Sequence, residues 1–114
     1  MLNQSTTLDL AFQALADPAR RAMLERLSAG PASVSELARP LTMSMPAVLQ
    51  HLAVLEQAGL ATSLKTGRVR TCEIGTARLD EVQSWLNARR AEWEARFDRL
   101  EAYLNELQDG EKNG

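Results

Sequence analysis

The stretch SMPAVLQH, residues 44 to 51, brings small, uncharged and hydrogen-bonding side chains together in one run. Leu49 can contact a thymine methyl group, and the Gln50 amide can pair with adenine through two hydrogen bonds. If Ser44 begins a helix, the amides and dipole at that end suit a phosphate. The chemistry fits the DNA major groove. The candidate DNA-contacting residues of this run are Ser44, Met45, Pro46, Ala47, Leu49, Gln50 and His51.

A second candidate site follows 15 to 20 residues later. Lys65, Arg68 and Arg70 surround the dipeptide Thr66-Gly67, and no acidic residue lies between Lys65 and Glu73. Three cations at a turn can hold phosphates or enter the minor groove, although solvated hairpin charge is the plainer interpretation. Because the three cations follow the candidate DNA-contacting run, we favour DNA binding over solvated charge. These three residues complete the candidate DNA-binding set.

Other residues that could do chemistry have plainer explanations. His51 lies on the edge of an apolar helix stripe, where packing is favoured over a base contact. Cys72 is the only cysteine, so it forms no intrachain disulfide, and a buried apolar role is favoured over thiol sensing. The chain has one His, no Gly-rich phosphate loop and no acids at site spacing. We therefore expect no enzyme, no metal site and no cofactor.

Local signals predict two helices before the first candidate site. Apolar residues within 8 to 16 recur at helical spacing. Asp17 is a typical N-cap, Pro18 fits the first helical position, and Gly30 marks the end of this second helix. Arg20, Arg21 and Arg26 lie on it, and either phosphate contact or solubility would explain them.

The next two helices form a helix-turn-helix over residues 33 to 58. A capping box at Ser33 begins the first, which ends before Pro40. Ser44 is the N-cap of the second, and Gly59 lies just past its end. Val48, Leu52 and Leu55 face inward on this helix, so the candidate DNA-contacting residues lie mainly on its other side.

After residue 59 the apolar period changes from helical to alternating. Residues 60 to 65 and 68 to 74 are predicted as strands of a hairpin, or wing, covering 60 to 74. Residues 77 to 108 then return to helical spacing, and 109 to 114 are predicted to be a disordered tail. The fold class is therefore mainly α with a small β-hairpin wing.

The last predicted helix is too long for the domain that precedes it. Its apolar residues run from Leu79 to Leu107, which corresponds to about 40 Å of helix. Something outside the domain must cover part of this stripe. Trp85, Trp93 and Phe97 could line an effector pocket between subunits, but interface core is the commoner role for aromatic residues on a helix stripe.

Composition limits the class of protein. The 114 residues, 45% of them hydrophobic, are enough for one compact domain. The net charge is −2, but residues 1 to 78 carry eight Lys/Arg against six Asp/Glu, whereas residues 79 to 114 carry five against nine. An anionic partner is therefore expected on the first part. No 18-residue apolar run or secretory signal is present, so we expect a cytoplasmic protein without a membrane partner.

The segments ALADPARRAMLERL, VSELARPLTMSMPAVLQHLAVLEQAGL and GRVRTCEI together resemble the ArsR family of bacterial winged-helix regulators. The resemblance implies a single winged-helix domain over 1–114 that binds a DNA operator as a homodimer and represses until an effector relieves it. It implies that helices 8–16 and 77–108 form the dimer interface. The expected interface residues are Leu8, Phe12, Leu79, Val82, Leu86, Trp93, Phe97, Leu100 and Leu104.

Two departures from the family pattern matter. The metal-sensing members' Cys-x-Cys box is replaced here by SVSELARPL, and the last helix has no His. The sequence is more similar to a metal-independent subgroup, whose members commonly have Ser-Lys in place of Leu49-Gln50. The operator sequence therefore does not carry over. The alternative function is a winged-helix protein-interaction module without specific DNA binding.

Overall fold

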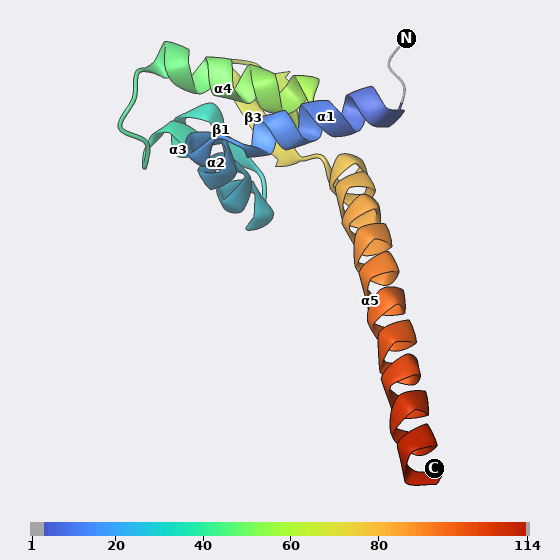
Figure 1. Ribbon diagram of the computed structural model, residues 1–114. Coiled ribbons are helices and arrows are strands. Elements are labelled where there is room, and N and C mark those ends of the chain that lie inside the picture. Colours follow the sequence, from blue (N-terminus) through green and yellow to red (C-terminus); the bar gives the residue numbers. More distant parts are fainter. Residues whose placement is uncertain (1–3, 114) are drawn as a thin grey trace. The chain divides into compact units, whose positions relative to one another are not determined.

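The computed structural model describes residues 4–113, with side chains described for 6–111. The chain forms two compact units, residues 1–82 and 83–114, and each is described by itself. The elements, labelled in Figure 1, are α1 (Gln4–Leu15), α2 (Pro18–Ser28), β1 (Ala32–Ser33), α3 (Val34–Ala38), α4 (Met45–Gln57), β2 (Ala61–Thr66), β3 (Val69–Ile74) and α5 (Thr76–Asn113). The predicted class, mainly α with a small β wing, is confirmed.

The first unit packs its helices and sheet around one apolar core. The inward residues predicted for α4, which are Val48, Leu52 and Leu55, are all fully buried. The second turn of α5 adds Val82, which is only 6% exposed. The full set of buried hydrophobic residues is Ala11, Ala14, Met23, Leu24, Leu27, Ala32, Leu37, Val48, Leu52, Leu55, Ala58, Leu60, Ala61, Cys72 and Val82.

The helix boundaries in this unit follow the capping residues. The Asp17 carboxylate accepts from the Arg20 amide at 3.0 Å, and the Ser44 hydroxyl accepts from the Ala47 amide at 3.3 Å. Ser33 and Glu36 form the full capping box. Each of these interactions satisfies an amide that has no intrahelical partner, which is why the three helices begin where the sequence predicts.

The sheet has one strand more than predicted. Its order is β1-β3-β2, with antiparallel pairing throughout and Ala32 opposite Cys72. A strand of two residues is too short to show alternation of apolar and polar residues, so β1 has no recognisable pattern in the sequence. The hairpin turn also lies one residue later than predicted, at Gly67-Arg68, because Thr66 pairs with Val69 and Gly67 adopts the positive φ of 64°.

Three helix limits differ from the prediction. α1 begins at Gln4, not residue 8, because its first turns are polar and apolar spacing does not register them. α5 runs from Thr76 to Asn113 where 77–108 was predicted. The tail predicted to be disordered is therefore helical through Asn113, while Gly114 lies outside the described residues. Extending a helix that already exists costs little free energy. The one glycine in this segment, Gly110, makes the helix less stable than alanine would by only about 1 kcal/mol.

The wing and α5 are joined by a close backbone approach. The Gly75 amide donates to the Leu60 carbonyl at 2.7 Å. A Cβ on Gly75 would meet the Gly59 carbonyl oxygen at 2.1 Å, so no side chain fits there. Gly59 itself has a φ of 76°, the left-handed conformation expected just past a helix end.

Candidate DNA interface

The outer face of α4 is uncharged, as the sequence predicts. Met45 and Leu49 are 43% and 39% exposed, and Gln50 is exposed beside them. Ala47 is half-buried, and no Asp, Glu, Lys or Arg occurs between Ser44 and Leu55. A face of this kind can approach base edges and methyl groups without desolvating a charge.

The amino end of α4 offers fewer free amides than expected. Pro46 has no amide hydrogen, and the Ala47 amide donates to the Ser44 hydroxyl. The Val48 amide donates to the Ser44 carbonyl as the first helical bond. The helix dipole still favours an anion at this end, but several donors that the prediction counted are already used.

The tip of the wing carries two exposed cations. Lys65 and Arg68 flank Gly67 and are both exposed. Leu64 and Val69, 72% and 54% exposed, place apolar side chains at the same tip. Neither residue is among the predicted DNA contacts, although their alternation with polar neighbours is visible in the strands. The tip therefore combines phosphate-binding cations with apolar side chains that could enter a groove.

The third wing cation, Arg70, is engaged within the chain. Its Nη2 donates to both Glu56 carboxylate oxygens, at 2.9 and 3.0 Å, and its Nε donates to the Ser63 hydroxyl at 2.9 Å. The Ser63 hydroxyl in turn donates to Glu56 at 2.6 Å. Arg70 therefore ties both wing strands to the carboxyl-terminal turn of α4. Glu56 lies 14 positions from Arg70 in the chain, so the local charge pattern gave no sign of this ion pair.

An open hollow lies between the wing and the outer face of α4, which we call the reading face. Its walls come from α3, α4 and the hairpin, and they include Ser33, Ser35, Met45, Leu49, Lys65 and Arg68. Two hydroxyl groups and three cationic side chains, those of Lys65, Arg68 and Arg70, thus line the hollow together with apolar side chains. The structure brings together the two stretches that the sequence marks as candidate sites.

His51 does not belong to this surface. Its Nδ1 lies 3.2 Å from Nη1 of Arg20 and 3.8 Å from the Asp17 carboxylate. Because a guanidinium can only donate, Nδ1 of His51 is the acceptor in its contact with Arg20. This position agrees with the packing interpretation of His51. The backbone hydrogen bond from Arg20 is the main cause that lowers the pKa of Asp17 from its usual value of 3.8.

The α2 arginines join elements of the chain rather than forming a phosphate patch. Arg20 donates to the Ala14 and Gln13 carbonyls, and Arg21 donates to the Leu15 carbonyl at 2.7 Å. Together they cap the last turn of α1. An arginine that follows closely after a helix end is the sequence signal that could have predicted these hydrogen bonds to the last carbonyls of α1.

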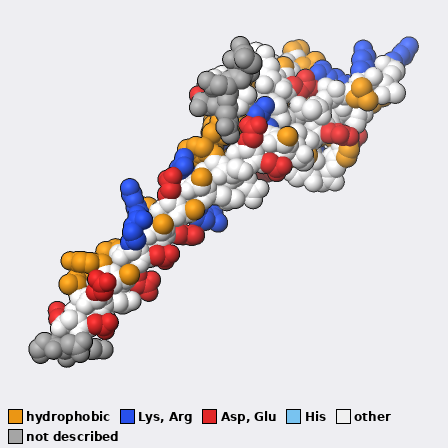
Figure 2. All heavy atoms as spheres, turned by 90° about the vertical axis from the view of Figure 1, so that its right-hand side faces the viewer, with side chains coloured by type: hydrophobic (Ala, Val, Ile, Leu, Met, Phe, Trp, Pro, Cys, Tyr) orange, Lys and Arg blue, Asp and Glu red, His pale blue; other side chains and the backbone are white. Residues whose placement is uncertain are grey.

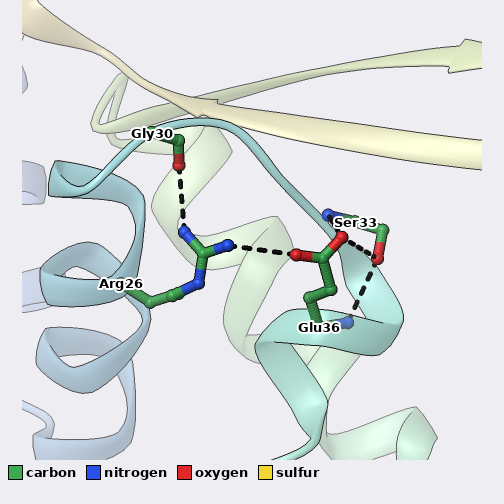
Figure 3. Close-up of polar contacts among 4 residues, drawn as sticks. All are labelled: Arg26, Gly30, Ser33 and Glu36. Carbon is green, nitrogen blue, oxygen red and sulfur yellow. Dashed lines mark hydrogen bonds and ion pairs between the residues drawn. The ribbon is translucent and has the colours of Figure 1, made fainter.

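Arg26 connects α2 to the start of α3 (Figure 3). It donates to the Gly30 carbonyl at 3.2 Å and to Glu36 at 3.0 Å, while the other Glu36 oxygen faces Ser33. The Ser33 backbone and side-chain hydrogen bonds, aided by Arg26, lower the pKa of Glu36 from its usual 4.5. The start of the helix-turn-helix is therefore anchored by an ionised carboxylate.

Cys72 is fully buried between β1 and β2, in the middle of the sheet. Burial is the main cause that raises the pKa of its thiol. A protonated, inaccessible thiol reacts slowly, which favours the apolar role expected from the sequence.

The predicted interface residues divide into two groups. Val82 is buried in the core of its own unit, so it is not available to a partner as predicted, whereas Leu8 and Leu79 pack against that core and remain half-buried. Leu86, Trp93, Phe97, Leu100 and Leu104 are between 48% and 59% exposed, and Phe12 is 37% exposed. Figure 2 shows hydrophobic side chains exposed on α5 among its charged ones. The Trp93 and Phe97 rings meet edge to face at 5.0 Å.

Two general features complete the site. Among the described residues, no group of three or more His, Cys, Asp or Glu side chains is placed to hold a metal ion. Within the same part of the chain, no helix combines the length and apolar character needed to cross a membrane.

Comparison with known proteins agrees with this geometry. Residues 15–63 match a family model described as a helix-turn-helix domain. The chain is 46% identical over 79 residues to the HTH-type transcriptional regulator Rv2034 of Mycobacterium tuberculosis, covering 69% of this chain and 74% of that protein. It is 28% identical over 75 residues to the transcriptional repressor SdpR of Bacillus subtilis, covering 66% and 83%.

A solved structure extends the similarity to most of the chain. The crystal structure of the ArsR family transcriptional regulator RHA00566 superimposes with a TM-score of 0.76 and 47% identity, covering 82% of this chain and 97% of that one. The fold and the site define a winged helix-turn-helix DNA-binding regulator. The chain belongs to the ArsR family of transcriptional regulators.

Proposed function

We propose that this regulator binds its operator as a homodimer, with the outer face of α4 in the major groove and the wing tip on the backbone or minor groove. The observation that carries the proposal is the hollow between α4 and the wing, where an uncharged reading face lies beside Lys65 and Arg68. Gln50 and Leu49 read bases, and the two cations hold phosphate. Arg70 positions the wing from behind through Glu56.

The dimer supports this mode of binding. Two copies related by a twofold axis would read half-sites about 34 to 36 Å apart on one face of the duplex. The exposed stripe of α5, with Leu8 and Phe12 of α1, supplies the proposed dimer contacts. As a repressor acting on chromosomal DNA, the protein would work in the cytoplasm, without catalysis and without a cofactor. A small-molecule effector that relieves repression belongs to the same proposal.

The test replaces one base-reading side chain and one phosphate-binding side chain together. Gln50→Ala combined with Arg68→Ala should leave the dimer intact and abolish preference for DNA from upstream of the gene over a scrambled duplex. Arg68→Ala alone should reduce the slope of log K against log salt by about 0.9 for each lost phosphate contact. Fluorescence anisotropy titrated across salt measures both.

Arg99→Ala is the matched control, because it removes an exposed cation from the second unit. It should leave the salt slope unchanged. If operator binding survived the double replacement, the proposed DNA surface would be wrong. Equal weak binding of the parent protein to both duplexes would favour the protein-interaction module instead.

A further inference from the structure

The first unit leaves few large hydrophobic side chains in water, and most of them lie on the proposed DNA surface. Within its described residues, five such side chains are exposed: Phe12 on α1, Met45 and Leu49 on α4, and Leu64 and Val69 on the wing. Single exposed apolar side chains are common on proteins. A group of them that adjoins a binding surface indicates contact with a partner.

The two apolar side chains of the wing lie on one face of the hairpin, close to its turn. Leu64 is 72% exposed and Val69 is 54% exposed. Leu64 pairs with Thr71, and Val69 pairs with Thr66, which is two residues further along β2 than Leu64. Leu64 and Val69 are therefore diagonal neighbours on the same face. We call them the apolar tip pair.

The opposite face of the hairpin is attached to the domain. Cys72 is fully buried, and Ser63, which pairs with it, donates to Glu56 at 2.6 Å. Arg70 donates to both oxygens of Glu56, at 2.9 and 3.0 Å. Charge-assisted hydrogen bonds of this kind fix orientation. The wing is therefore held on α4, and its apolar tip pair is kept in solvent.

The surroundings of the apolar tip pair match DNA. Lys65 and Arg68 are exposed at the same tip, and neither forms an ion pair with any other described residue. Val69 lines the hollow that Leu49 of the reading face also lines, so the pair is continuous with the proposed DNA surface. An apolar edge between two cations suits a narrow groove with phosphates along both sides, which is the minor groove.

We propose that Leu64 enters the minor groove beside each half-site as an apolar wedge that partly unstacks one base step and kinks the operator. Leucine is among the side chains that proteins insert between base steps in this way. Val69 covers the neighbouring sugars, and Lys65 and Arg68 hold the flanking phosphates. The inference rests on the proposed mode of operator binding and adds the residue that enters the groove and the deformation that it causes.

The wedge would make the regulator select part of the operator without reading its bases. The minor groove presents a degenerate pattern of donors and acceptors, so Leu64 cannot read sequence there directly. The cost of unstacking nevertheless depends on the step, because TA and CA steps kink easily whereas A-tracts are stiff. We therefore expect a flexible pyrimidine–purine step where the wing meets each half-site.

Bending of bound DNA tests the wedge. The probe is a duplex from upstream of the gene with a fluorophore at each end, saturated with the full-length protein. The parent should increase energy transfer between the ends, as a kink of about 20 to 90° requires. Leu64→Thr keeps a side chain that favours strands but removes the apolar wedge. It should lose most of this increase at saturation and bind about tenfold more weakly.

Two variants of the same strand are the controls. Thr62→Ala changes the same face two residues further from the tip, and should leave the affinity and the bend unchanged. Lys65→Ala should reduce the slope of log K against log salt by about 0.9 and keep the bend. Leu64→Thr should show the reverse, an unchanged slope and a lost bend. Circular dichroism confirms that each variant is folded.

A fluorescent base provides a second, independent readout. 2-Aminopurine replaces adenine at each TA or CA step of the upstream duplex in turn, and its fluorescence rises when stacking is lost. One step in each half-site should respond to the parent but not to Leu64→Thr. Replacing that step with an A-tract should weaken binding of the parent about tenfold and leave binding of Leu64→Thr unchanged.

The outcomes separate the wedge from the binding mode on which it rests. Loss of the bend and of the 2-aminopurine signal in Leu64→Thr, with both retained in Thr62→Ala, supports the wedge. An operator that stays straight with the parent, or one that Leu64→Thr bends equally, overturns the wedge and leaves the binding mode standing. A parent protein that shows no preference for the upstream duplex over a scrambled one overturns both.

Discussion

Helices α4 and α5 both carry apolar residues at helical spacing, yet α4 buries this side within the first unit, whereas α5 does so only as far as Val82. On α4, Leu52 and its inward neighbours are fully buried, which leaves the opposite face available to DNA. On α5, every described residue from Gln83 onward is exposed. The difference shows two uses of one kind of helix. The first is held by the fold and presents a site, whereas the second needs another molecule to cover it.

The largest expected effect comes from breaking the core side of α4. Leu52→Ala should destabilise the first unit by about 3 kcal/mol, because it leaves a cavity in a fully buried site. Urea denaturation measures the change. Leu100→Ala is the matched variant on α5, where the side chain is 51% exposed. At concentrations below the dimer dissociation constant, Leu100→Ala should change the free energy of unfolding by less than about 0.5 kcal/mol. An equal loss of stability in both variants would contradict the difference between the two helices.

A smaller effect, on assembly, is expected from the apolar side of α5. Phe97→Glu should raise the dimer dissociation constant by about 30-fold, because a charge would have to leave water at the interface. Analytical ultracentrifugation measures this, and weaker operator binding should accompany it. Asp98→Asn, one residue further along and on the side of the helix away from Phe97 and Leu100, should leave the dimer unchanged. A stable Phe97→Glu monomer with unchanged DNA affinity would refute the dimeric mode of binding.

The smallest expected effect concerns acid. Because the pKa of Glu36 is lowered in the folded chain, its carboxylate stabilises the fold above the unfolded value of 4.5, and this stabilisation is lost as pH falls through the lowered value. Glu36→Gln should therefore be less stable than the parent at pH 7, and the difference should shrink below about pH 4.5. Urea unfolding across pH measures it, with Glu25→Gln, an exposed acid on α2, as the control. A difference that is constant with pH would contradict the role assigned to the capping box.

The parts of the fold that could be predicted from the sequence are those controlled by neighbouring residues. Asp17, Ser33 and Ser44 act on amides three positions away, so their caps can be recognised in the sequence. Apolar periodicity likewise identified the inward face of α4. Both candidate DNA-binding stretches follow from residue type and local charge.

The parts that could not be predicted depend on distance in the chain. Arg70 pairs with Glu56 from another element, and Arg20 reaches His51 across 31 positions. Strand β1 exists only because β3 lies beside it. Val82 has the same helical spacing as Leu86, and only the packed core decides that one is buried and the other exposed. These outcomes are set by the assembled tertiary structure.

The position of Cys72 has a practical consequence for watching this regulator at work. Its single thiol is shielded by the sheet and kept protonated by burial. A cysteine added at an exposed site can therefore be labelled selectively with a fluorophore or nitroxide while the native residue stays in place. A probe on the wing tip and another on α5 would each report separately, so motion in the two units could be followed during operator capture in an otherwise unaltered chain.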